Sequence, residues 1–137
     1  METMDTQKLA STLLRISLGV MFLAHSIVLK YFTFTLAGTA QYFESIGLPG
    51  FAAYVVFAAE AIGGALLVLG IQTRWVALAL IPVLLGATWA HAGNGWVFNA
   101  ANGSWEYPVF LIVVSVAVAL LAAPSRLIKG ARVAVGV

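Results

Sequence analysis

The stretch FAAYVVFAAEAIGGALLVLG, residues 51–70, decides the fold, because it is apolar throughout except for one carboxylate, Glu60, at its middle. At a rise of about 1.5 Å per residue, such a stretch spans about 30 Å, the thickness of the hydrocarbon core of a bilayer. A charged side chain at that depth costs about 2.5 kcal/mol or more unless it is paired or neutral. The stretch therefore predicts a transmembrane helix, and Glu60 is its candidate functional residue.

The composition extends this conclusion to the whole chain. Hydrophobic residues make up 62% of the 137 residues and charged residues 9%, which is too apolar for a water-soluble domain of this length. A short amphipathic segment, about residues 35–46, predicts an interfacial helix between the first and second spans. The predicted fold class is an all-α membrane protein, with residues 1–137 forming one domain, a bundle of four transmembrane helices. The expected spans cover about residues 9–31, 51–70, 75–92 and 106–124.

Charged residues indicate the orientation and exclude some classes of function. Loops rich in Lys and Arg stay in the cytoplasm, so we expect a multi-pass protein of the cell (inner) membrane with both termini cytoplasmic. The net charge of +2 comes from residues at helix ends rather than from a basic patch, which argues against a nucleic-acid partner. The absence of cysteine excludes a thiol relay, so a redox role needs a bound cofactor. The basic residues that set the orientation are Lys8, Arg74, Arg126, Lys129 and Arg132.

The polar residues of the apolar runs predict one pocket. Ionisable side chains in transmembrane helices nearly always face the bundle interior. We therefore expect an outward-opening pocket with Glu60 at its floor. Arg15 lies deeper in the first span, where its side chain either pairs with Glu60 or extends to the cytoplasmic headgroups. The other candidates lie at the outer ends of the spans: His25, His91, Glu106 and Tyr107.

Each of these residues also has a purely structural interpretation. Glu60 and Arg15 can form an interhelical clamp, and the two histidines can be ordinary interfacial residues. Gly63 and Gly64, beside Glu60, favour close helix packing. In the expected interfacial helix, Thr39 falls outside the apolar face.

The order of several motifs resembles one known family. These motifs are LLRISLGVMFLAHSIVLK (residues 13–30), AGTAQYFESIGLPG (37–50), AAEAIGGALLVLGIQTRW (58–75) and WEYP (105–108). Together they resemble the DoxX family of small four-helix membrane proteins over about residues 13–124. That family is named for its similarity to a subunit of an archaeal thiosulfate-to-quinone oxidoreductase. The resemblance therefore implies redox-linked work at the membrane, by a DoxX-like transmembrane domain.

The leading hypothesis is an integral membrane subunit of a redox system that interacts with quinone and supports electron transfer from a peripheral oxidoreductase. Glu60 and His91 would exchange protons and hydrogen bonds with the quinone carbonyls, and Arg15 would tune Glu60. Trp89, or other aromatic residues near the outer pocket, would stack on the ring. The remaining cofactor-binding candidates are His25, Glu106 and Tyr107. The sequence leaves open whether the chain has enzyme activity of its own.

Other functions and ligands fit the same sequence. A non-catalytic scaffold or assembly partner would contact a peripheral enzyme through the outer loop, residues 93–105. A small-solute binding or transport protein would use the Glu60 pocket, with motion near Pro82. Haem between His25 and His91 is geometrically possible but less favoured than quinone, and no metal site is expected. In the lipid bilayer we expect a homo-oligomer or a complex with a partner redox enzyme.

Overall fold

A computed structural model describes residues 3–95 and 105–122, and every regular element in that part of the chain is a helix. Five α-helices form the bundle, and helix α1 continues directly into a π-helix, η1. A single 3₁₀ turn, η2, follows α4. The elements are α1 (Thr3–Leu23), η1 (Ala24–Thr33), α2 (Leu36–Ser45), α3 (Phe51–Leu69), α4 (Thr73–His91), η2 (Ala92–Asn94) and α5 (Glu106–Leu121).

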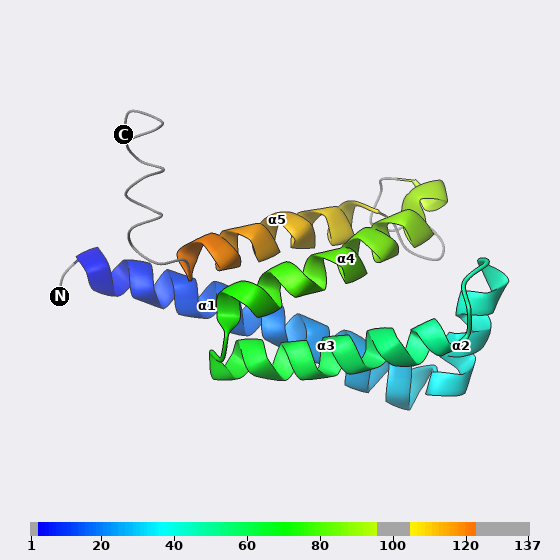
Figure 1. Cartoon of the computed structure of the whole chain (residues 1–137). Coiled ribbons are helices and arrows are strands. Elements are labelled where there is room, and N and C mark those ends of the chain that lie inside the picture. The colour runs from blue at the N-terminus through cyan, green and yellow to red at the C-terminus, as the bar shows by residue number, and fades with distance from the viewer. Residues whose placement is uncertain (1–2, 96–104, 123–137) are drawn as a thin grey trace.

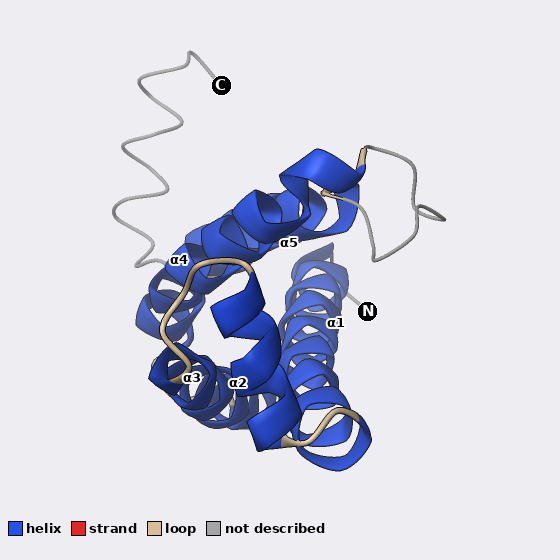
Figure 2. Ribbon diagram, turned by 90° about the vertical axis from the view of Figure 1, so that its right-hand side faces the viewer, coloured by secondary structure: helices blue, strands red, loops and turns tan. Residues whose placement is uncertain are grey.

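The long helices are arranged as two pairs. Helix α1 packs mainly on α3, and α4 packs mainly on α5 (Figure 1). The short helix α2 lies at one end of the bundle, which is the end that faces the viewer in Figure 2. The buried apolar core is formed by Leu18, Phe22, Leu67, Ala77, Leu80, Leu84, Leu111, Val118 and Ala119.

Three helices are long and apolar enough to cross a membrane: Thr6–Thr33, Phe51–Leu69 and Thr73–His91. They confirm the first three expected spans to within a few residues. Helix α5 has 16 residues, which is about 24 Å and shorter than a hydrocarbon core of about 30 Å. The fourth span therefore stays a prediction, and the end that was expected for it at residue 124 lies outside the described residues.

Glycines bring α1 and α3 into backbone contact. A Cβ atom at Gly19 would lie 2.7 Å from the carbonyl oxygen of Gly64, and a Cβ at Gly64 would lie 2.9 Å from that of Gly19. A Cβ at Gly63 would lie 2.9 Å from Leu80 of α4. The packing role expected for Gly63 and Gly64 is therefore confirmed. Small residues of this kind let transmembrane helices approach closely.

Arg15 fastens α1 to the end of α3. Its Nη1 donates hydrogen bonds to the carbonyl oxygens of Leu67 (2.6 Å) and Val68 (2.9 Å). These carbonyls belong to the last turn of α3, where backbone acceptors lack partners within the helix and the helix dipole attracts a cation. The expected pairing of Arg15 with Glu60 is wrong, because the guanidinium group is held at the helix end instead.

The π-helix η1 is a feature that hydropathy did not predict. Its ten residues follow α1 without a break. The backbone N–H of Phe34 donates to the carbonyl of Leu29, and the hydroxyl of Thr33 donates to that of Val28, both five residues back. π-Helical turns are rare and occur frequently at functional sites.

Helix α2 confirms a helix at about residues 35–46, and its position at the membrane surface stays a prediction. It begins after Thr35, which has a φ of 63° and accepts a hydrogen bond from the N–H of Gly38. The expectation for Thr39 is wrong: this side chain is buried, and its hydroxyl donates to the carbonyl of Thr35. The face that carries Thr39 looks into the bundle rather than away from it.

Candidate functional site

A cavity of about 1470 Å³ opens at the α2 end of the bundle, between the two helix pairs. Residues from α1, η1, α2, α3, α4 and α5 line it. Most of its wall is apolar, and a few polar groups project from it, which is the usual make-up of a small-molecule site. Five of the residues predicted from the sequence line this cavity together: His25, Glu60, His91, Glu106 and Tyr107.

An ion pair lies at the inner part of the cavity. Nζ of Lys30 is 2.7 Å from Oε1 of Glu60, and the two side chains are 18% and 6% exposed. Glu60 is the tenth of the 19 residues of α3, so the pair lies midway along a membrane-spanning helix. The carboxylate therefore has the partner that its depth requires, and that partner is Lys30.

The π-helix places Lys30 on the side of the cavity. His25 and Lys30 are five residues apart, which would set them about 140° apart around an α-helix. In η1 the hydrogen bonds span five residues and each turn is wider than in an α-helix, so the two side chains lie closer together around the helix axis, and both line the cavity. The wider turn of this helix is thus the reason that Lys30 reaches Glu60.

The two histidines present the same hydrogen-bonding group to the cavity. Nδ1 of His91 lies 2.8 Å from the carbonyl oxygen of Ala87, and Nδ1 of His25 lies 3.3 Å from that of Met21. A carbonyl oxygen can only accept, so Nδ1 carries the proton in each hydrogen bond. When such a ring is uncharged, Nε2 is the nitrogen that can accept a hydrogen bond or a proton.

Helix α5 adds a second wall of polar and aromatic groups. Glu106 and Tyr107 are its first two residues, and both line the cavity. The ring of Tyr107 lies 6.2 Å from the ring of His25, centroid to centroid. This contact joins η1 to α5 across the cavity.

Trp89 lies outside the described cavity lining, so of the two alternatives expected for stacking the structure favours other aromatic residues near the pocket. Its side chain is 58% exposed, and it is absent from the described residues that line the cavity. Other aromatic rings form the wall instead. They are Phe22, Phe34, Tyr42, Phe43 and Phe110.

Comparison with known proteins places this site in a family context. The sequence model of the DoxX family matches residues 10–93, which is more than half of the chain. The chain belongs to the DoxX family. This DoxX protein is also 42% identical, over 80 residues, to a protein of Bacillus subtilis (strain 168) that bears the name "Putative oxidoreductase CatD". That similarity covers 58% of this chain and 58% of the relative. No solved structure matches the chain.

The family match covers most of the site of this DoxX protein. His25, Lys30, Glu60 and His91 lie inside the matched range, whereas α5 lies outside it. In the described residues, no group of three or more His, Asp or Glu side chains is placed to hold a metal ion. The expected scaffold loop, residues 93–105, lies mostly outside the described residues.

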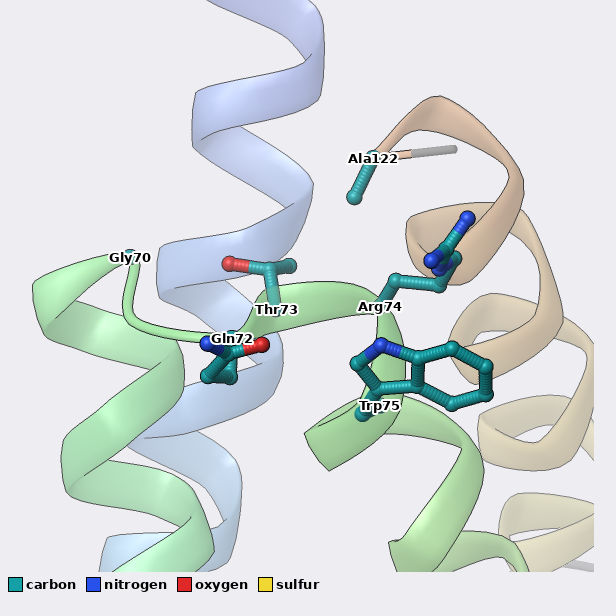
Figure 3. A pocket seen from close by; sticks show the side chains of 6 residues that line it. All are labelled: Gly70, Gln72, Thr73, Arg74, Trp75 and Ala122. Carbon is teal, nitrogen blue, oxygen red and sulfur yellow. The ribbon is translucent and has the colours of Figure 1, made fainter. Parts of the chain in front are cut away.

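A second, smaller hollow of about 360 Å³ lies at the opposite end of this DoxX protein, at the α3–α4 turn (Figure 3). Its one charged residue among the described lining is Arg74, whose guanidinium carbon lies 4.5 Å from the centroid of the Trp75 ring. The described residues that line this hollow include no acid or imidazole for proton exchange. Its remaining described lining residues are Gly70, Gln72, Thr73 and Ala122.

Lys30 is the residue that the sequence reasoning missed. It follows a run of apolar residues and precedes Tyr31 and Phe32, a pattern typical of a headgroup-level anchor. The depth of Glu60 in its span could have indicated the role of Lys30. A buried carboxylate needs a cation, and few basic residues are available within the spans. If this segment is assumed to be α-helical, Lys30 lies on a different face of the helix from His25. The pairing of Lys30 with Glu60 is then not expected.

Proposed function

We propose that this protein is an integral membrane subunit of a redox system, and that its cavity binds a quinone supplied with electrons by a peripheral oxidoreductase. The observation that carries the proposal is the Lys30–Glu60 pair in a large, mostly apolar cavity at half depth of the membrane helices. A quinone has a ring with polar oxygens and an apolar tail, so its parts match the ion pair and the apolar wall of the cavity. The name of the relative from Bacillus subtilis supports an oxidoreductase context.

The polar groups suit the two oxygens of a quinone ring. The ammonium group of Lys30 can donate a hydrogen bond to a carbonyl oxygen, and Nε2 of His25 or His91 can accept one from a hydroxyl. A quinone supplies reversible two-electron, two-proton chemistry, while the protein supplies orientation and protons. Glu60 holds Lys30 in position and can take up or release a proton beside it. The aromatic wall accepts the ring face.

Cavity occupancy is tested best with a variant that fills the space without disturbing the packing. Gly86 lines the cavity, and a Cβ atom there would meet no atom within 4 Å. The substitution Gly86→Trp should therefore leave the protein folded and reduce the volume for a ligand. The matched control is Leu85→Trp, at the neighbouring position, whose side chain is 55% exposed and is not part of the described cavity lining.

Native mass spectrometry of the purified protein in mild detergent gives the readout, with menadione and decylubiquinone as probes. We expect wild type and Leu85→Trp to retain the mass of at least one of these quinones, and Gly86→Trp to lose it. The same spectra give the oligomer mass. Absence of both quinones from wild type, or equal retention by Gly86→Trp, would overturn the proposal.

The proton role of Glu60 is tested by Glu60→Gln. This change keeps the size and shape of the side chain, replaces one accepting oxygen by a donating amide group, and removes the negative charge together with the ability to exchange a proton at neutral pH. We expect quinone reduction in membranes that contain the protein and its electron donor to fall by roughly 100-fold, with an unchanged amount of protein in the membrane. Unchanged turnover in a folded Gln variant would reject this role.

A further inference from the structure

The polar residues of the cavity all lie to one side of Glu60. Lys30 belongs to η1, Thr39 to α2, His91 is the last residue of α4, and Glu106 is the first residue of α5. These elements meet at the α2 end of the bundle (Figures 1 and 2). A cavity of about 1470 Å³ whose mostly apolar wall carries these polar groups can hold water beside them, since one water needs only about 30 Å³ of liquid volume. A polar route therefore connects the middle of the membrane with the α2 side.

The other side of Glu60 is closed and apolar. The backbones of Gly19 and Gly64 touch there, and Leu80 fills the space beside Gly63. The buried polar side chains in the described part of the chain are those of Ser26, Thr39, Glu60 and Ser115. Ser115 is the tenth residue of α5, as Glu60 is of α3, so its hydroxyl lies at about the level of Glu60 and not beyond it. The fully packed residues between Glu60 and the α3–α4 turn are apolar: Leu18, Leu67, Ala77, Val118 and Ala119.

Arg15 does not bridge this apolar layer. Its guanidinium group is held by the carbonyl oxygens of Leu67 and Val68, at the far end of α3. The guanidinium group therefore contacts the end of α3 and is not part of a chain of polar groups that leads to Glu60. Proton transfer needs hydrogen-bonding groups or water in sequence, and a layer of packed Leu, Val and Ala side chains provides neither.

We propose that the cavity gives Glu60 proton exchange with the aqueous phase on the α2 side of the membrane and with the opposite phase not at all. This inference goes beyond quinone binding, because it holds for any occupant of the cavity. Combined with the proposed function, it has a direct consequence. Reduction of a quinone to a quinol takes two electrons from the peripheral oxidoreductase and two protons, and both protons come from the α2 side.

Single cysteines can test the access route, because the chain has no cysteine of its own. Val56→Cys places a thiol in the cavity wall, four residues from Glu60 toward the α2 end. Ile62→Cys is the matched control at similar depth, because Ile62 is 61% exposed and not part of the described cavity lining. Gln41→Cys in α2 and Ile71→Cys at the α3–α4 turn mark the two sides of the membrane.

The probe is a charged, membrane-impermeant thiol reagent added to sealed vesicles of each orientation. We expect Val56→Cys to react from the side that labels Gln41→Cys, at least ~10-fold faster than Ile62→Cys, since only a hydrated thiol forms the reactive thiolate. From the side that labels Ile71→Cys it should not react.

Reaction of Val56→Cys from the Ile71 side, from both sides or from neither would overturn the proposal. Gel filtration in detergent checks that each variant is folded. Ala87→Cys, in the cavity wall on α4, is a second reporter should Val56→Cys misfold. Labelling does not depend on a quinone, so failure of quinone binding and failure of one-sided access are separate results.

Discussion

The two ends of the bundle are built from the same helices but are packed in opposite ways. Toward the α3–α4 turn, α1 and α3 meet backbone to backbone at Gly19 and Gly64, and Arg15 in the middle of α1 holds the end of α3. Toward α2, the helix pairs enclose a cavity whose wall holds an ion pair and two imidazoles. A rigid, closed end can thus hold the helices together while charged groups face open space at the other end. Changes at the closed end should therefore affect stability most.

Gly64→Leu should have the largest effect on stability. Its new side chain would meet backbone atoms of α1, including the carbonyl oxygen of Gly19, and backbone cannot move aside as a flexible side chain does. We expect a loss of about 4 kcal/mol or more in the free energy of unfolding, enough to prevent accumulation of folded protein. Gly86→Leu is the matched control, because a Cβ there meets no atom within 4 Å. Thermal unfolding in mild detergent compares the two, and equal loss in both variants would contradict the contrast between the ends.

Breaking the ion pair should have the next largest effect. Lys30→Met leaves Glu60 as a buried carboxylate without its cation, which should cost about 3 kcal/mol. The double variant Lys30→Met with Glu60→Leu removes both charges and should recover most of that loss. A double-mutant cycle of unfolding free energies measures the coupling. Additive losses would show that the pair contributes no coupling energy.

Arg15→Ala should have a smaller effect. The change removes two charge-assisted hydrogen bonds to the carbonyls of Leu67 and Val68, for which we expect a loss of about 2 kcal/mol. Arg15→Lys keeps the positive charge at the helix end and should recover part of it. Because Arg15 does not contact Glu60, neither variant should change quinone retention. A selective loss of quinone by a folded Arg15→Ala protein would show that the two ends are coupled.

The sequence predicted the cavity residues better than it predicted their partners. Apolar runs revealed three spans, and polar residues within them indicated Glu60, His25 and His91, because such residues are too costly to leave in lipid. The partner of Glu60 was missed, since hydropathy and an assumed α-helical register contain no sign of a π-helix. Lys30 then looked like an anchor at the headgroups, and Arg15 looked available although the end of α3 holds it.

Photolabelling with an azido-quinone shows where the quinone binds, because the described part of the chain has hollows at opposite ends of the bundle. After irradiation of the purified protein, mass spectrometry of peptides locates the modified residues. We expect labels on residues that line the cavity at the α2 end, in η1, α4 or α5, and their loss in Gly86→Trp. Labels confined to the hollow at Gly70–Trp75, or unchanged labelling in Gly86→Trp, would contradict it.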